Sequence, residues 1–558
     1  MPETVLQLDP RDNVVVALSN LEAGVTVQFG PASVKAICTA KEKIPAKHKM
    51  ALTDLNPGDL VFMYGMVVGE VVHAIPRGGL LTTHNIRHRA GAYSATRQPA
   101  SIATPDASSW KGRTFMGYHR ADGQVGTRNY WIVLPLVFCE NRNIEQMQEA
   151  LEEELGYGRA NSRYRMHVRQ LIQQLRSGSG VAAESAVPAA AVEEQPRDGR
   201  IFPNLDGVRF ITHQMGCGGT RQDAQALCGL LAGYIHNPNV AGATVLSLGC
   251  QNAQAGLLLD ELRARNPKVA AATKPVLIVD QQKSGRESTL MQEALDRTFA
   301  ALAEANRVQR APAPLSALTV GLQCGGSDGF SGISANPTVG YVSDLIAGVG
   351  GTTMLSEFPE LHGVEQELVN RCVNDELAER FSNLMRTYAA RAKASQSDFA
   401  FNPSPGNIRD GLITDAIKSA GAARKGGVGP VRGVIDYPEY VTARGLNLQC
   451  TPGNDVESVT AQVGAGCNLV LFTTGLGTPT GNPIAPVIKI STNTTLFERM
   501  GDIIDFNAGG IVTGEESVSE CAEKLLELSI AVASGEHRTH SELRGQIDFI
   551  PWKRGVSL

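Results

Sequence analysis

Residues 321–332 (GLQCGGSDGFSG) combine five glycines with side chains that can do chemistry. Cys324 offers a thiol, Ser327 and Ser331 offer hydroxyls, and Asp328 offers a carboxylate. The segment follows a short apolar run and precedes a helix-like stretch, which predicts a turn at the carboxyl end of a strand, where glycines let the backbone approach a ligand closely. For one such turn alone, a structural turn with a buried thiol is the favoured interpretation. The same layout recurs elsewhere in the chain, and this recurrence favours a site.

Two other apolar runs end in Cys/Gly turns, at residues 208–219 and 243–252. With a later segment they supply a candidate metal set: His213, Cys217, Cys250, Cys324 and Glu357. Thiolates with an imidazole or a carboxylate suit a soft or borderline cation such as iron. Because only His213 and Cys217 are close in sequence, buried thiols without an ion are an equally supported alternative.

Residues 473–482 (TTGLGTPTGN) are rich in hydroxyls, backbone amides and glycine. They match neither the Walker A pattern nor GxGxxG, so a nucleotide is disfavoured. The loop suits a small, hydroxylated substrate, and we expect Thr474 to contact it, with Lys489 and Asn493 supplying charge and hydrogen bonds. An ordinary glycine-rich loop is the alternative.

The elements that would position these residues alternate between strand and helix from residue 208 onward, which predicts an α/β fold with a parallel sheet. Nearly every polar cluster follows an apolar run, so these clusters are expected at the carboxyl ends of the strands. We expect a small β domain at 1–95, a linker at 96–113, a middle α/β domain at 114–310 and a catalytic domain at 311–558. Residues 177–199 lack apolar periodicity and are interpreted as a mobile insertion.

The composition describes a globular protein of 558 residues with a net charge of −5. Basic residues are scattered, so no nucleic acid partner is expected. The absence of a long apolar segment and of a signal peptide predicts a cytoplasmic protein without a membrane partner. The ten cysteines form no close CxxC pair, which argues against a disulfide framework or a zinc ribbon and favours reduced thiols.

Several segments in one order resemble the altronate/galactarate dehydratase family. They are residues 117–130 (GYHRADGQVGTRNY), 213–218 (HQMGCG), 249–250 (GC), 321–328 (GLQCGGSD), 451–455 (TPGND) and 472–479 (FTTGLGTP). Residues 46–49 (AKHK) and 74–79 (AIPRGG) resemble the family's SAF-type β-clip domain. Residues 138–143 (FCENRN) look more like the altronate branch than the galactarate branch.

The resemblance implies a metal-dependent sugar-acid dehydratase with a β-clip domain, a middle domain and a Rossmann-like parallel-sheet domain. It implies ferrous iron or a similar divalent ion such as Mn²⁺, and it leaves an iron–sulfur cluster open. We expect a homodimer or a higher homo-oligomer that acts on a small sugar acid. The expected metal ligands are Cys217, Cys250, Cys324 and Glu357.

Dehydration of altronate removes the C2 proton and the C3 hydroxyl, and the C2 proton is too weakly acidic unless a cation neutralises the adjacent carboxylate. We expect His213 or Lys489 to act as the base and His48, from the β domain, to act as acid or substrate ligand. The expected substrate-binding residues are Arg77, Arg128, Asn141, Ser327, Asp328, Thr474 and Asn493.

Three other functions stay open at this point. The substrate could be galactarate or another aldonate or aldarate. A nicotinamide-dependent oxidoreductase would also use an α/β sheet, although the chain lacks GxGxxG and an acidic ribose partner. A sugar-acid binding protein without turnover is the third, since β-clip domains also occur as carbohydrate-binding parts.

Overall fold

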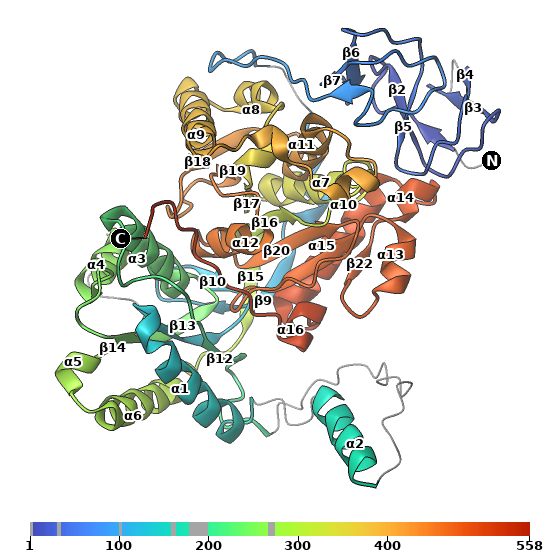
Figure 1. Ribbon diagram of the computed structural model, residues 1–558. Helices are drawn as coiled ribbons and strands as arrows, with labels where there is room; N and C mark the ends of the chain where they lie inside the picture. Colours follow the sequence, from blue (N-terminus) through green and yellow to red (C-terminus); the bar gives the residue numbers. More distant parts are fainter. Residues whose placement is uncertain are drawn as a thin grey trace.

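The computed structural model describes residues 4–30, 35–99, 103–157, 163–177, 199–265 and 274–557. Almost all of the expected insertion at 177–199 falls outside these residues. The chain forms a small β domain, a middle α/β domain and a large C-terminal α/β domain (Figure 1). The expected α/β fold with a small N-terminal β domain is therefore confirmed.

The N-terminal domain consists of short antiparallel strands in two three-stranded sheets and one strand pair, with the orders β1-β2-β5, β6-β7-β8 and β3-β4. All four side chains of β2 are buried, so this strand forms the centre of the domain. The strands are β1 (Val5–Leu6), β2 (Val14–Ala17), β3 (Thr26–Phe29), β4 (Ala36–Thr39), β5 (Lys49–Ala51), β6 (Leu60–Met63), β7 (Met66–Val71) and β8 (Ile86–Arg87).

The middle domain is built on a parallel sheet with the strand order β12-β11-β13-β14. Alternate residues of β11 pack on opposite faces: Ile132 packs with α3 on one face, and Val133 packs with α1 and α6 on the other. Helices on both faces explain why this strand is a continuous apolar run. The elements are β11 (Tyr130–Pro135), α1 (Asn141–Glu154), α2 (Arg163–Ser177), β12 (Gly207–Phe210), α3 (Arg221–His236), β13 (Val240–Ser247), α4 (Ala255–Arg265), β14 (Val276–Asp280), α5 (Gln281–Ser284) and α6 (Glu287–Ala305).

A separate antiparallel sheet joins the entrance and the exit of the middle domain. Its strands are β9 (Thr114–His119), β10 (Val125–Gly126) and β15 (Ala311–Pro314), in the order β10-β9-β15. Because β9 precedes the middle domain and β15 follows it, their pairing brings the two ends of that domain together.

The C-terminal domain contains a seven-stranded parallel sheet in the order β18-β19-β17-β16-β20-β21-β22. Its strands are β16 (Thr319–Cys324), β17 (Thr352–Leu355), β18 (Val431–Ile435), β19 (Gly445–Gln449), β20 (Leu469–Thr474), β21 (Val487–Ser491) and β22 (Phe506–Asn507). Its helices are α7 (Ala335–Gly348), α8 (Glu365–Arg371), α9 (Asp375–Ala394), α10 (Pro405–Arg409), α11 (Asp415–Ala423), α12 (Asp455–Gly464), α13 (Thr494–Arg499), α14 (Gly510–Thr513), α15 (Val518–Ser534) and α16 (His540–Arg544).

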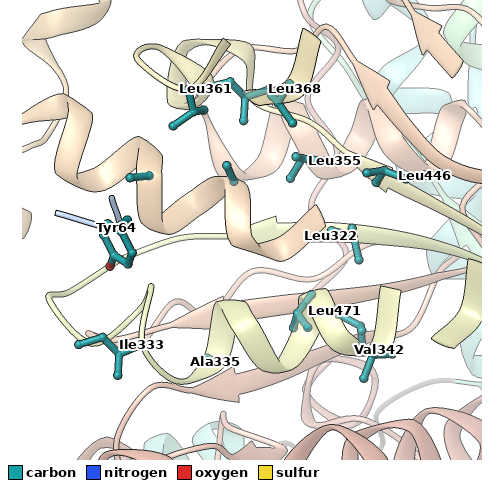
Figure 2. Close-up of a cluster of buried hydrophobic side chains, with 14 of the residues drawn as sticks. Tyr64, Leu322, Ile333, Ala335, Val342, Leu355, Leu361, Leu368, Leu446 and Leu471 are labelled. Carbon is teal, nitrogen blue, oxygen red and sulfur yellow. The ribbon is translucent and has the colours of Figure 1, made fainter. Parts of the chain in front are cut away.

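The core of the C-terminal domain extends into the N-terminal domain. Figure 2 shows leucines of four neighbouring strands, such as Leu322 and Leu355, with Val342 of α7 and with Tyr64 of the N-terminal domain. A Cβ atom added at Gly332 would lie 2.2 Å from the Tyr64 hydroxyl, so the backbone of the C-terminal domain passes directly beside this ring. The two domains therefore share one hydrophobic core. None of the helices in the described ranges is long and apolar enough to cross a membrane.

Candidate active site

Three adjacent strands of the C-terminal sheet, β19, β17 and β16, bring chemical groups to their shared carboxyl edge. Cys324 is the last residue of β16, and Glu357 and Glu360 follow β17, the latter in the 3₁₀ helix η5 (Phe358–Leu361). The loop after β19 leads to Asp455 at the start of α12. Lysines from α11 and from the following 3₁₀ helix η7 (Arg424–Gly426) complete the group. We call Cys324, Glu357, Glu360, Lys418, Lys425 and Asp455 the acid–base cluster.

Two ammonium groups hold the thiol and the carboxylates together. Lys425 Nζ lies 2.7 Å from Cys324 Sγ and 3.3 Å from Glu357 Oε2. Lys418 Nζ lies 2.7 Å from Glu360 Oε1. The Cys324 thiol donates to Glu360 Oε2 at 3.3 Å. Because these side chains are almost completely removed from water, the ion pairs are weakly screened.

The two glutamates have pKa values displaced in opposite directions. Burial, and then the charge of Glu360, raise the pKa of Glu357 to about 8. Burial also opposes the ionisation of Glu360, but the charges of Lys418 and Lys425 outweigh it and lower the pKa of Glu360 to about 2. At neutral pH one carboxyl group is therefore protonated beside one that is ionised. Opposed pKa shifts in neighbouring carboxyl groups are common in acid–base sites and also occur in structural ion-pair networks.

Glu357 has an unusual backbone conformation. Its φ angle of +64° lies in the left-handed region that residues other than glycine rarely adopt. Its N–H donates to Thr451 Oγ1 at 2.9 Å, which holds the residue in place. Its Oε1 atom is buried and has no hydrogen-bond partner in the part of the chain that the structure describes. A strained backbone and an unsatisfied acceptor on one buried residue favour a functional role for Glu357.

Asp455 lies directly against the turn after β16. A Cβ atom added at Gly325 would lie 2.1 Å from Asp455 Oδ2, so only glycine leaves room for this carboxylate. Burial, and then Glu360, raise the pKa of Asp455 to about 6. Asp455 and Lys418 are partly exposed, whereas the other members of the acid–base cluster are buried. These two are therefore the members of the cluster with partial contact with solvent.

Asp328 joins the N-terminal domain to the sheet. Its Oδ2 atom lies 3.0 Å from Lys47 Nζ and accepts hydrogen bonds from Thr492 Oγ1 at 3.0 Å and Asn493 Nδ2 at 3.4 Å. Lys47 Nζ also lies 2.8 Å from Asp410 Oδ1. The structure thus brings together Asp328 and Asn493, two predicted substrate-binding residues. They bind each other, and Asp328 also binds Lys47 of the N-terminal domain.

Ser327 and Thr474, also predicted to bind substrate, make local contacts. The Ser327 carbonyl accepts from Asn407 Nδ2 at 2.7 Å. Thr474 Oγ1 accepts the N–H of Gly477 at 2.9 Å and so stabilises its own loop. Both side chains are buried.

Arg128 lies just before β11, at the amino end of the middle sheet, opposite to the edge expected for ligands. Its Nε and Nη2 donate to the two carboxylate oxygens of Glu542 at 2.6 and 2.9 Å. Its Nη1 donates to the carbonyls of Thr127 and Val532. Arg128 is buried, and these contacts make it a structural link between the middle domain and α16.

His213 has both ring nitrogens engaged. Nε2 donates to the Pro135 carbonyl at 2.9 Å, and Nδ1 accepts the Met215 N–H at 3.1 Å, in the tautomer that these partners require. Burial lowers the pKa of His213 to about 4. Asn141 Nδ2 donates to the His213 carbonyl at 2.9 Å. In this arrangement His213 has no free lone pair for a substrate proton, and the pair His213 and Asn141 positions the loop that carries Cys217.

The remaining candidate residues are spread over the molecule. Lys489 is buried in the middle of β21 and donates to Gln546 Oε1 at 2.6 Å, and burial lowers its pKa to about 8. His48 is half-buried next to the Lys47 contact, and burial lowers its pKa. Arg77 is exposed, and its guanidinium donates to the Ile37 carbonyl within the N-terminal domain.

The predicted metal ligands divide between two domains. Among the described residues, the donor atoms of Cys324, Glu357 and Glu360 lie within 4.8 Å of one another, and neither Cys217 nor Cys250 belongs to such a group. The four predicted ligands are therefore not gathered around one point, because Cys217 and Cys250 follow strands of the middle sheet.

Cys217 and Cys250 lie instead near a third thiol, Cys139, in the 3₁₀ helix η2 (Phe138–Glu140) after β11. The loops are joined, since the Phe138 N–H donates to the Met215 carbonyl at 3.1 Å and the Asn252 N–H donates to the Cys217 carbonyl at 3.2 Å. Desolvation, and then the neighbouring Cys217 and Cys250, raise the pKa of Cys139. We call these three exposed, free cysteines the thiol triad.

The two donor sets differ in how well they fit the iron that the resemblance implies. In the acid–base cluster, the ammonium of Lys425 already lies against Cys324 and Glu357, and Lys418 neutralises Glu360, so an added dication does not fit. The thiol triad offers three exposed soft donors, and thiolates are ligands that suit iron. Among the described residues, the triad is not one of the groups whose donor atoms all lie within 4.8 Å of one another.

Five residues of these two groups were not predicted from the sequence: Glu360, Lys418, Lys425, Asp455 and Cys139. Two of them could have been found from the sequence. Asp455 lies in the segment TPGND, one of those that resemble the family, and Cys139 follows an apolar run in the same way as Cys217 and Cys250. Lys418 and Lys425 come from a helical region without a chemical motif. Only the packing of α11 and η7 against the sheet brings them to the site.

Family models match nearly the whole chain. The SAF domain of altronate/galactarate dehydratases matches residues 3–89, the second domain of D-galactarate dehydratase/altronate hydrolase matches 117–306, and the C-terminal domain of D-galactarate/altronate dehydratases matches 315–557.

Full-length relatives agree with these matches. The chain is 31% identical to the altronate dehydratase of Bacillus subtilis over 100% of both chains, and 30% identical to that of Escherichia coli over 99% of both. It is 32% identical to the galactarate dehydratase (L-threo-forming) of Escherichia coli over 97% of this chain and 94% of the relative. The chain therefore belongs to the altronate/galactarate dehydratase family of sugar-acid hydro-lyases.

Proposed function

We propose that this enzyme converts D-altronate to 2-keto-3-deoxy-D-gluconate and water. The proposal is supported by two altronate dehydratases that align with at least 99% of this chain and of their own length. The segment FCENRN at residues 138–143 supports it further. Galactarate is the alternative substrate, because a galactarate dehydratase is equally similar over slightly less of its length.

The reaction breaks the C2–H and C3–O bonds. A base takes the C2 proton, an acid protonates the departing C3 hydroxyl to give water, and the enol that results becomes the 2-keto acid. The base must be deprotonated and the acid protonated at the same pH, and each acts best when its pKa is near that pH. The site must therefore hold two groups with pKa values on either side of neutrality.

The acid–base cluster contains such a pair, and this is the observation that carries the mechanism. Asp455, with a pKa of about 6, is ionised at neutral pH and partly exposed, so we assign it as the base. Glu357, with a pKa of about 8, keeps its proton there, so we assign it as the acid. Lys418 lies at the accessible side and can attract the substrate carboxylate. Lys489, whose pKa is about 8, is the second candidate for the base.

We further propose that the thiol triad holds iron, as a cluster or as a single ion. When bound, such a group would supply a Lewis acid. Cys217→Ser should lose most of the iron and of the visible absorption of protein prepared without oxygen. Cys228→Ser, which changes a buried thiol on α3, should keep both. Unchanged iron content in Cys217→Ser would contradict the placement of iron at the thiol triad.

Activity is tested by adding altronate, galactarate or NAD separately to reduced protein and measuring 2-keto acid and NADH. We expect 2-keto acid from altronate, none from Asp455→Asn, and full activity from Glu457→Gln, which changes another acidic side chain in the first turn of α12. A higher kcat/KM for galactarate would replace the proposed substrate. Binding of both sugar acids without turnover would contradict the proposal.

A further inference from the structure

A cluster of two histidines and one aspartate that could hold a metal ion lies where the N-terminal domain meets the C-terminal domain. His88 follows β8, His362 follows η5, and Asp415 begins α11. One ring nitrogen of each histidine and one carboxylate oxygen of Asp415 lie within 4.8 Å of one another. These residues belong neither to the acid–base cluster nor to the thiol triad, and they come from segments far apart in sequence.

Asp415 is a buried carboxylate without a hydrogen-bond partner among the described residues. The residue is 1% exposed, and neither of its carboxylate oxygens has a hydrogen bond to the described part of the chain. His88 Nδ1 is also buried and has no hydrogen bond to any described residue. Buried polar groups are nearly always paired, because an unpaired one costs several kilocalories per mole. Three unsatisfied atoms at one place therefore indicate a missing partner.

The orientation of His362 favours a cation as that partner. His362 Nδ1 lies 3.0 Å from Glu365 Oε1, and a proton on this nitrogen leaves the lone pair of Nε2 free. Metal-binding histidines usually donate their second N–H to a carboxylate, a backbone carbonyl or water. The rings of His88 and His362 stack with their centroids 5.2 Å apart, so the two imidazoles are already side by side.

The surrounding charge also favours a cation. Glu360, Glu365 and Asp398 all act on Asp415 with negative charge. Lys418 is the positive group acting on Asp415, and its ammonium is paired with Glu360 at 2.7 Å. The cluster therefore has an excess of negative charge around two imidazoles.

We propose that His88, His362 and Asp415 bind a divalent transition-metal ion of the borderline class, Zn²⁺ or Fe²⁺. Two imidazoles and one carboxylate suit these ions, whereas Mg²⁺ and Ca²⁺ prefer oxygen ligands throughout. Water completes the coordination. The ion links the N-terminal domain, through His88, to the two segments that carry Glu360 and Lys418, and so it stabilises the arrangement of domains around the acid–base cluster.

The test uses the full-length protein after treatment with a chelator. Zn²⁺ binding is measured by calorimetry and metal analysis, and Co²⁺ binding by visible absorption, which separates nitrogen and oxygen ligands from the sulfur ligands of the thiol triad. The double variant His88→Ala/His362→Ala should bind one equivalent fewer than the wild type, without loss of the sulfur-to-cobalt absorption. The control is His73→Ala/His84→Ala, since that pair also stacks, at 4.7 Å, but belongs to no metal-binding group among the described residues.

A third variant keeps the test independent of folding. Asp415→Asn preserves the shape of the side chain and should weaken Zn²⁺ binding at this site by about tenfold or more. Zn²⁺ should raise the melting temperature of the wild type and of the His73/His84 control more than that of Asp415→Asn. Equal stoichiometry and affinity in the wild type and the ligand variants, or no nitrogen and oxygen site in the wild type, would overturn the inference. Either result leaves the proposed dehydratase activity untouched, because that activity is assayed separately.

Discussion

Replacing Glu357 by glutamine removes the proposed acid while keeping the shape of the side chain. The amide oxygen can still accept from Lys425, which lies 3.3 Å from Glu357 Oε2, so the fold should persist. General acid catalysis typically contributes about 10²- to 10⁴-fold, or about 3–5 kcal/mol of transition-state stabilisation. We expect kcat to fall by a factor in this range.

The pH profile gives the sharper test of this variant. In the wild type, kcat/KM should fall below about pH 6, as Asp455 takes up a proton, and above about pH 8, as Glu357 loses its proton. Glu357→Gln should lose the decline at high pH and keep the decline at low pH. The assay is 2-keto acid formation from altronate across pH 5–10, with Glu457→Gln as the control.

Two results would refute the reasoning. If Glu357→Gln keeps nearly the full wild-type kcat, Glu357 is not the acid. If kcat/KM of the variant is low but still declines above about pH 8, another group causes that decline. The raised pKa of Glu357 then plays no part in catalysis. Circular dichroism and the melting temperature of the variant establish that a loss of activity is not a loss of fold.

The remaining predictions concern packing and charge. Lys425→Met should lower the free energy of unfolding in urea by about 1–3 kcal/mol, because the buried Cys324 and Glu357 side chains lose the hydrogen bonds that the ammonium donates. Arg128→Met should also lower the free energy of unfolding, by about 3–5 kcal/mol, because Glu542 remains as a buried unpaired charge. The kcat of the folded variant should not change, and a large loss of kcat would indicate that Arg128 binds substrate. Gly325→Ala should lower kcat, since the new Cβ would lie 2.1 Å from Asp455 Oδ2. Gly256→Ala should leave kcat unchanged, because no described atom lies within 4 Å of its new Cβ.

The sequence alone determined the class of the fold and the location of its functional edge. Largely apolar runs predicted strands such as β11 and β20, because a strand covered on both faces needs a continuous apolar stretch. Glycine-rich turns after these runs predicted the carboxyl-end loops, and Cys324 and Glu357 were found there. Several motifs in one order were sufficient to recognise the family.

The partners of these residues were decided only by the tertiary structure. Cys324 and Asp455 are 131 positions apart, and they meet because β17 and β19 follow β16 in the sheet and not because of any local pattern. Arg128 looks like a ligand-binding cation in its motif, yet packing places Glu542 beside it. Composition and spacing describe which groups a chain carries, whereas strand order and burial determine which charges are neutralised and which remain free for chemistry.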